Sequence, residues 1–254
     1  MLAWVIKIGV LAYLGVAGYL YLAQRSLMYF PTPEVASGDV DYEYLDSGGP
    51  RLKLWTLGDP RASRALIYFG GNAENVYFNA GDFRRLFAQH RVYLVNYRGY
   101  GGSEGRPTER GLFEDALRIF DLVDSRHDSV AVIGRSLGSA VAVYLASRRS
   151  AERLVLATPP DSAVALARAM YPVFPVDWLL KDRYESVRYA ADVTVPTKVL
   201  IAEHDRVVPP RHSLALVEAL VAAPVEHVTI AAAGHNGLAD VEQYWREMHE
   251  FLHR

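Results

Sequence analysis

The stretch Ser129–Ser147, SVAVIGRSLGSAVAVYLAS, constrains the fold more than any other part of the chain. It opens with an apolar run over 129–133 that is rich in β-branched residues and too brief for a helix. This run predicts a strand buried on both faces. The small and apolar residues of 139–146 are typical of a helix packed closely on a sheet. Between them lies Gly134-Arg135-Ser136-Leu137-Gly138, so the order is strand, G-x-S-x-G, helix.

That order makes Ser136 a candidate nucleophile. A serine on a tight strand-to-helix turn adopts a strained backbone conformation and projects its hydroxyl above the edge of the sheet. Glycines two residues to either side leave room for the strand and the helix to approach. The helix N-terminus also offers free N–H groups to a developing oxyanion. The alternative is an ordinary serine N-cap, but the flanking strand and helix favour the nucleophile.

A nucleophilic serine needs a base, and the base needs an orienting acid. Residues 197–202 predict a later strand, and Asp205 follows its C-terminal end. Residues 226–230 predict the last strand, and His235 lies in the loop after it. The chain order Ser136, Asp205, His235 therefore predicts a serine, acid and base on neighbouring loops.

Other residues compete for these supporting roles. Asp161 follows the apolar strand predicted at 154–157 and is the main rival to Asp205 for the acid. His204 precedes the acid in the chain, and His227 lies inside a strand pattern, so neither fits the expected order as the base.

Five motifs lie in order between residues 70 and 236. They read Gly70-Gly71-Asn72-Ala73-Glu74-Asn75, Tyr97-Arg98-Gly99-Tyr100-Gly101-Gly102-Ser103-Glu104-Gly105, Gly134–Gly138, His204-Asp205-Arg206-Val207-Val208-Pro209 and Gly234-His235-Asn236. Together they resemble the α/β-hydrolase superfamily, and more narrowly its membrane-anchored, serine aminopeptidase-like branch, which includes α/β-hydrolase domain-containing lipid hydrolases and protein depalmitoylases. The resemblance covers residues 25 to 254. It implies an α/β fold with a mostly parallel central sheet flanked by helices.

The resemblance also implies an oxyanion hole formed by the backbone N–H groups of Asn72 and Leu137. A plainer interpretation is a glycine turn in which the Asn72 side chain caps a helix. Two residues depart from the family pattern. Gly70 replaces the usual histidine of the first loop, and Gly237 stands where an acidic residue often follows the His-Asn pair. The departure at Gly70 is the one feature that favours a non-catalytic binding protein.

Composition narrows the remaining classes. A chain of 254 residues, 51% of them hydrophobic, can bury the core of one α/β domain. Its formal charge of −2 argues against nucleic acid as a partner. There is no cysteine for a disulfide or a lipid anchor. No metal is expected, because H-E-x-x-H spacings are absent, and no cofactor is expected, because the glycines at 98–105 match no phosphate-binding motif. The oligomeric state stays open.

The N-terminus predicts a membrane anchor. Residues 2–23 are apolar apart from Lys7, and at about 1.5 Å per residue they extend roughly 33 Å, enough to cross a bilayer core. A cleaved signal peptide is the alternative. Signal peptidase sites have a small residue at the third position before the cut, and for a cut after Ala23 that position holds the bulky Tyr21. We therefore expect an uncleaved signal anchor over 1–24. Two positive charges, the amino terminus and Lys7, lie at the start of the apolar stretch, and one, Arg25, follows its end. Because positive charge is enriched on the cytoplasmic side of membrane helices, we expect the N-terminus inside and the catalytic domain outside, which in a bacterium is the periplasm.

The catalytic domain is expected over 25–254, with a short lid at about 163–190. Within this segment, residues 170–180 are rich in aromatic residues and prolines and carry one charged residue, Asp177, which suits a substrate with an acyl group. A helix packed on the core is the alternative. The predicted function is a membrane-anchored serine hydrolase that cleaves a carboxylic ester or thioester, acting on a small acyl or lipid-like substrate. A serine peptidase and a non-catalytic membrane-tethered binding protein are the alternative functions.

Overall fold

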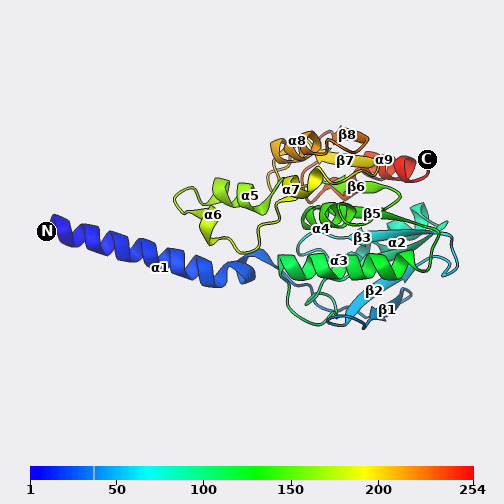
Figure 1. Cartoon of the computed structure of the whole chain (residues 1–254), viewed down its shortest axis with the longest axis horizontal. Helices are drawn as coiled ribbons and strands as arrows, with labels where there is room; N and C mark the ends of the chain where they lie inside the picture. Colours follow the sequence, from blue (N-terminus) through cyan, green and yellow to red (C-terminus); the bar gives the residue numbers. More distant parts are fainter. Residues whose placement is uncertain (37) are drawn as a thin grey trace.

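Eight strands form one sheet in the computed structural model, which describes residues 1–36 and 38–254 (Figure 1). Across the sheet the order is β1-β2-β4-β3-β5-β6-β7-β8. The edge strands β1 and β2 pair antiparallel, β2 also pairs antiparallel with β4, and all other neighbours are parallel. The strands are β1 (Asp41–Leu45), β2 (Leu52–Leu57), β3 (Arg64–Phe69), β4 (His90–Val95), β5 (Ser129–Arg135), β6 (Leu154–Ala157), β7 (Thr197–Ala202) and β8 (Val225–Ile230).

Helices cover both faces of this sheet because its central strands are apolar on both sides. In β3, Ile67 and Phe69 belong to one hydrophobic core, and Leu66 and Tyr68 belong to the other. One face carries α3 (Glu109–Asp124), α4 (Leu137–Ala146), α7 (Ser186–Ala190) and α8 (Pro210–Ala219); the other carries α2 (Ala80–Leu86) and α9 (Glu242–Leu252). Two short 3-10 helices, η1 (Val76–Asn79) and η2 (Leu238–Asp240), complete the body of the domain.

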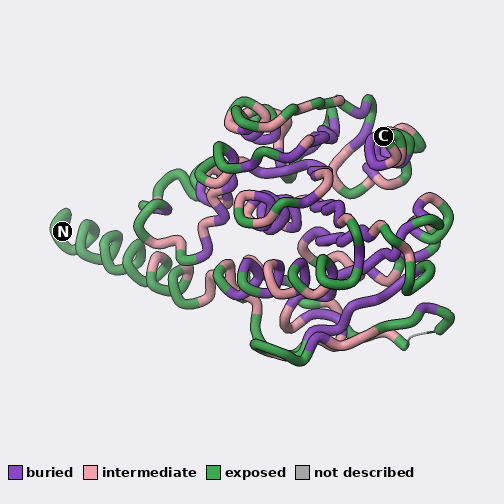
Figure 2. The backbone as a smooth tube through the Cα atoms, turned by 45° about the vertical axis from the view of Figure 1, so that its right-hand side comes forward, coloured by how far each residue is buried: buried purple, intermediate pink, exposed green. Residues whose placement is uncertain are grey.

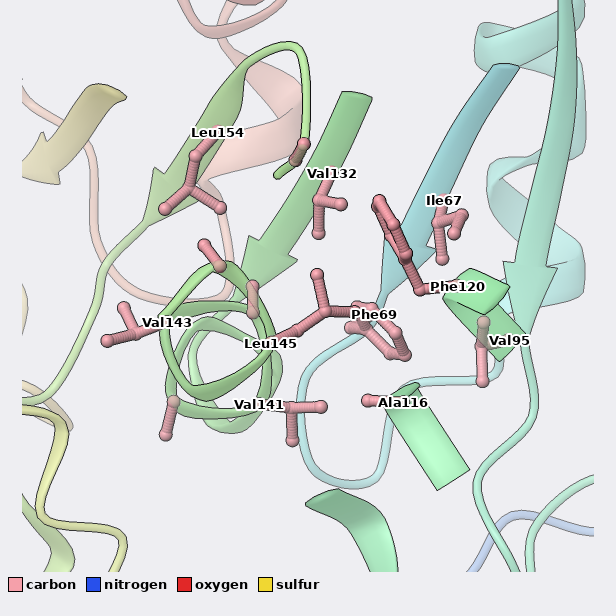
Figure 3. Packing of buried hydrophobic residues seen from close by; sticks show 14 of the residues in the cluster. Ile67, Phe69, Val95, Ala116, Phe120, Val132, Val141, Val143, Leu145 and Leu154 are labelled. Atoms are coloured by element: carbon pink, nitrogen blue, oxygen red, sulfur yellow. The ribbon is translucent and has the colours of Figure 1, made fainter. Parts of the chain in front are cut away.

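The helix α4 is packed against the centre of the sheet. Figure 3 shows Val141 and Leu145 of this helix beside Phe69 of β3, with Phe120 of α3 next to them. All four side chains are buried. This packing holds the turn between β5 and α4 in place. The predicted α/β fold with a mostly parallel sheet is therefore confirmed.

A single long helix, α1 (Leu2–Met28), precedes the domain. No residue of α1 is buried, and its tube in Figure 2 is mostly green with a few intermediate positions in pink. Its 27 residues correspond to about 40 Å, so it is a candidate membrane span. The expected boundary between anchor and domain, after residue 24, falls inside this helix because α1 continues to Met28.

The segment predicted as a lid contains three helices that behave differently. α5 (Ala163–Met170) and α6 (Val176–Leu179) lie away from the sheet, alongside the C-terminal half of α1 (Figure 1). By contrast, α7 packs against α4 and α8, and its Ala190 belongs to the core. Of the predicted lid, only α5 and α6 therefore lie apart from the body of the domain, to which α7 belongs.

Candidate active site

Ser136 occupies the sharp turn between β5 and α4. Its backbone has φ 52° and ψ −116°, a strained conformation for a residue with a side chain. The flanking glycines permit this turn. A Cβ at Gly138 would lie 2.0 Å from the carbonyl oxygen of Phe69, and one at Gly134 would lie 2.4 Å from that of Gly138. The Ser136 side chain makes no helix-capping hydrogen bond, so the N-cap alternative is not what the structure shows.

The Ser136 hydroxyl contacts a histidine instead. His235 Nε2 lies 3.0 Å from Ser136 Oγ, and His235 Nδ1 lies 2.7 Å from Asp205 Oδ2. The other oxygen of Asp205 accepts hydrogen bonds from the backbone N–H groups of Val207 and Val208. With its side chain only 1% exposed, this carboxylate has one orientation and faces the imidazole. The structure therefore brings together the three side chains that the sequence singled out.

The competing residues lie elsewhere. Asp161 Oδ1 is 2.9 Å from His212 Nδ1 and also accepts a hydrogen bond from the backbone of Ser162. The Asp161 carboxylate is thus engaged with a different histidine. His204 and His227 are both exposed to solvent and make no contact with Ser136 among the described residues. Asp205 is the acid that the geometry favours.

The loop after β3 approaches the same serine. A Cβ at Gly71 would lie 3.7 Å from Ser136 Cβ. Within the described ranges 1–36 and 38–254, the backbone N–H groups of Asn72 and Leu137 donate to no protein acceptor. Both therefore have a hydrogen-bond donor available for an oxyanion.

The Asn72 side chain caps no helix N-terminus. Its amide group donates to the carbonyl of Met28 at 2.6 Å, and its Oδ1 accepts from Phe30 N–H and from the Tyr100 hydroxyl. Burial raises the pKa of Tyr100 to about 12, so that hydroxyl remains a donor at neutral pH. Asn75, not Asn72, caps the adjacent helix η1. The Asn72 side chain thus ties its loop to the end of α1.

An ion pair that sequence reasoning missed supports the loop and the serine turn together. Arg135 Nη1 lies 2.9 Å from Glu74 Oε2, and Arg135 Nη2 donates to the carbonyl of His235. Glu74 also accepts from the Gly71 N–H and from the Tyr68 hydroxyl. Although burial by itself lowers the pKa of Arg135, the adjacent Glu74 carboxylate raises it above its ordinary value. Both residues stood inside the motifs, but only the fold shows that they meet.

Comparison with known proteins identifies the family of this fold. Residues 64–184 match the family model described as the alpha/beta hydrolase fold. The uncharacterized protein Rv2307c of Mycobacterium tuberculosis is 35% identical over 251 residues, which cover 91% of this chain and 87% of that protein. The chain belongs to the α/β-hydrolase superfamily. Human alpha/beta hydrolase domain-containing protein 17B is 27% identical to this α/β hydrolase, with 92% and 81% of the two chains covered.

Solved structures show the same fold for this α/β hydrolase. The Pyrococcus furiosus esterase Pf2001 superimposes with a TM-score of 0.67 at 19% identity, covering 89% of this chain and 97% of the esterase. The thioesterase domain from the curacin biosynthetic pathway gives a TM-score of 0.61 at 16% identity, covering 85% and 100%. At these identities the similarity concerns the fold.

The glycine that departs from the family pattern has a local explanation in this α/β hydrolase. A Cβ at Gly70 would lie 2.6 Å from Val76 Cγ1, so a side chain does not fit there without a shift of Val76. The Gly70 carbonyl accepts a hydrogen bond from the Tyr97 hydroxyl at 2.7 Å. Tyr97 and the Glu74 carboxylate therefore brace the loop without the usual histidine. At Gly237, a Cβ would meet no atom closer than 3.7 Å, so nothing in the packing requires glycine.

Within the residues that the structure describes, no group of three or more histidine, aspartate or glutamate side chains is arranged to hold a metal ion.

We expect Glu74→Gln to lower the free energy of unfolding by about 3 kcal/mol, because it leaves the Arg135 guanidinium without its ionic partner in a largely buried site. Urea titration of the detergent-solubilised protein measures the change. Glu114→Gln is the matched control, since Glu114 pairs with Arg110 in solvent and its loss is expected to leave stability unchanged. Equal effects of the two substitutions would contradict a bracing role for Glu74.

Proposed function

We propose that this α/β hydrolase is a membrane-anchored serine hydrolase that cleaves a carboxylic ester or thioester bond of an acyl or lipid-like substrate. One observation carries the proposal: the hydroxyl of Ser136, on its strained turn, lies 3.0 Å from His235, whose far nitrogen lies 2.7 Å from the buried Asp205 carboxylate. Such a chain of serine, histidine and acid is what acyl transfer through a covalent intermediate needs.

In the first half of the proposed reaction, Ser136 Oγ attacks the carbonyl carbon while His235 Nε2 takes the hydroxyl proton. The carbonyl oxygen becomes an oxyanion and accepts hydrogen bonds from the N–H groups of Asn72 and Leu137. Asp205 accepts the Nδ1–H of His235 and stabilises the imidazolium. His235 then gives its proton to the leaving oxygen or sulfur, and the bond to the leaving group breaks.

In the second half, water replaces the leaving group. His235 takes a proton from water as the water oxygen attacks the acyl-enzyme carbonyl, and the same two N–H groups hold the second oxyanion. Return of the proton to Ser136 Oγ releases the carboxylic acid and restores the enzyme. Every proton transfer in this cycle passes through His235 Nε2.

The substrate class follows from the surroundings of the serine. The lid helices present apolar side chains beside the Asn72 loop, and the cavity there is lined almost entirely by apolar residues. An apolar site of this kind suits an acyl chain. The esterase and thioesterase among the structural neighbours fit the same class of reaction. We place the N-terminus inside and the catalytic domain outside, with α1 as the uncleaved anchor.

Labelling with a fluorophosphonate probe tests the proposal directly. We expect the full-length protein in detergent to form one covalent adduct, and mass spectrometry of the digested protein should locate it on Ser136. Failure of the folded protein to react would contradict an activated serine and favour the membrane-tethered binding protein. An adduct on a different serine would move the nucleophile away from the turn.

A further inference from the structure

An apolar cavity of about 400 Å³ lies between the C-terminal half of α1 and the lid. Such a volume is typical of small-molecule sites. Its walls come from two parts of the chain that are far apart in sequence, and they include Leu20, Leu27 and Met28 of α1 and Leu166, Met170 and Phe174 of the lid. The helix that is the candidate membrane span is therefore also one side of this cavity.

Specific contacts hold α1 against the lid. The Tyr13 ring stacks on Phe174 at a centroid distance of 5.1 Å, and its hydroxyl donates to the carbonyl of Val173. Further along, the Gln24 side chain donates to the carbonyl of Leu179 and accepts from the N–H of Lys181. These contacts are spread over three turns of α1. They fix the width of the cavity.

The last turn of α1 is held by charge. The Arg25 guanidinium forms two hydrogen bonds with the Asp182 carboxylate, at 2.8 and 3.2 Å. Asp182 is buried and also accepts from the backbone N–H of Glu109, at the start of α3. The bidentate pair therefore connects α1 to the lid segment and to the body of the domain.

The cavity extends to two loops that lie next to the proposed reaction centre, although Ser136 and His235 are not among its lining residues. Asn72 and Val207 both line it. Asn72 follows Gly71, whose Cβ position lies 3.7 Å from Ser136 Cβ, and Val207 follows closely after Asp205 in the acid loop. A chain lying along α1 would thus end beside the loop that approaches Ser136.

The outer surface of the lid is apolar where it lies beside α1. Trp178 and Val173 are 86% and 69% exposed. Large apolar side chains gathered next to a membrane-spanning helix are typical of a surface that rests on lipid. The cavity thus lies between a candidate membrane span and a lid that carries exposed apolar side chains.

From these observations, and resting on the function proposed above, we infer that α1 is a wall of the substrate site as well as an anchor. The ligand is a long acyl chain of an ester or thioester that resides in the bilayer. It enters sideways from the lipid, between α1 and the lid, and lies along α1 with its carbonyl carbon at Ser136. Residues of the membrane helix then set the chain length that the enzyme accepts.

A comparison of substrates with different acyl chain lengths tests whether α1 forms a wall of the substrate site. The full-length protein in lipid nanodiscs is assayed with p-nitrophenyl dodecanoate and p-nitrophenyl butanoate, and the ratio of the two kcat/KM values is the readout. Because each methylene buried in an apolar site is worth about a fourfold gain, Leu20→Trp, which fills the cavity, is expected to lower this ratio at least about tenfold. Leu22→Trp is the control, since Leu22 is 80% exposed and lies outside the cavity.

An unchanged ratio in Leu20→Trp, or an equal fall in both variants, would overturn the inference while leaving the serine mechanism intact. A wild-type protein that hydrolyses neither ester and takes no fluorophosphonate label would overturn the proposed function and this inference with it. The two failures are therefore distinguishable.

Crosslinking of the wild-type protein provides a second measurement that needs no variant. A long-chain alkyl fluorophosphonate with a diazirine at its far end is attached to Ser136 and then irradiated. We expect crosslinks to residues 20–28 of α1 and to the lid. Crosslinks only to other elements would overturn the inference.

A comparison of two substrates in the same bilayer distinguishes the two kinds of molecule that could carry the acyl chain. A phospholipid and a membrane-bound S-acyl peptide are presented in the nanodisc, and release of fatty acid is measured from each. Cleavage of either one supports entry from the bilayer and identifies the source. Cleavage of neither, by an enzyme that hydrolyses the water-soluble p-nitrophenyl butanoate, would overturn it.

Discussion

Ser136→Ala is expected to lower kcat for ester hydrolysis by about a millionfold, the loss measured when the nucleophile of a serine hydrolase triad is removed. The substitution deletes only the Oγ atom, which lies 3.0 Å from His235 Nε2, so no acyl-enzyme can form. The N–H groups of Asn72 and Leu137 and the apolar cavity remain, and they are expected to leave a residual rate about a thousandfold above that of water. Steady-state kinetics with the dodecanoate ester measure the change.

Ser147→Ala is the matched control for this substitution. Ser147 lies at the other end of α4, where its hydroxyl donates to the carbonyl of Tyr144. Its loss removes the same atom from the same helix without touching the site, so wild-type kinetics are expected. A Ser136→Ala protein that kept most of the wild-type rate would show that another group attacks the substrate.

Asp205→Asn is expected to lower kcat about ten-thousandfold. The Asp205 carboxylate accepts the Nδ1–H of His235, and an amide at this position favours the wrong tautomer and no longer stabilises the imidazolium. In the wild type, the backbone N–H groups of Val207 and Val208 donate to the charged Asp205 Oδ1. In the variant they donate to a neutral amide instead. The same kinetic assay reads out the loss, and fluorophosphonate labelling should slow in parallel.

The control for this prediction is Asp161→Asn, which changes the rival acid. Asp161 contacts His212 and not His235, so we expect activity close to that of the wild type, with denaturation used to confirm folding. The reverse pattern, an active Asp205→Asn and an inactive Asp161→Asn, would assign the orienting acid to Asp161.

Local patterns were enough to predict the strand, the serine turn and the loops of the site. Ser129 to Ile133 is apolar and β-branched, and it is flanked by a G-x-S-x-G turn whose glycines have a steric reason to be there. Ser136, Asp205 and His235 each follow a strand in the parallel part of the sheet. The carboxyl ends of such strands meet at one edge, so their loops also meet.

Contacts between distant segments could not be predicted in the same way. Glu74 and Arg135 are 61 residues apart, and nothing in either motif says that one side chain pairs with the other. The choice between Asp205 and Asp161 was likewise open, because both follow strands and only the fold shows which one His235 reaches. The packing of α1 against the lid likewise depends on contacts between distant residues, such as the hydrogen bond between Gln24 and Lys181, which are 157 residues apart.

The end of α1 matters for how this protein is prepared. A soluble fragment that begins after this helix would lack both Met28 and Arg25. The Asn72 amide would lose its acceptor, and Asp182, whose side chain is 5% exposed, would keep a carboxylate without its guanidinium partner. Removing α1 to improve solubility would therefore also alter the loop beside Ser136. Rates obtained from such a fragment would describe a disturbed enzyme, so the complete chain in detergent or a nanodisc is the appropriate sample.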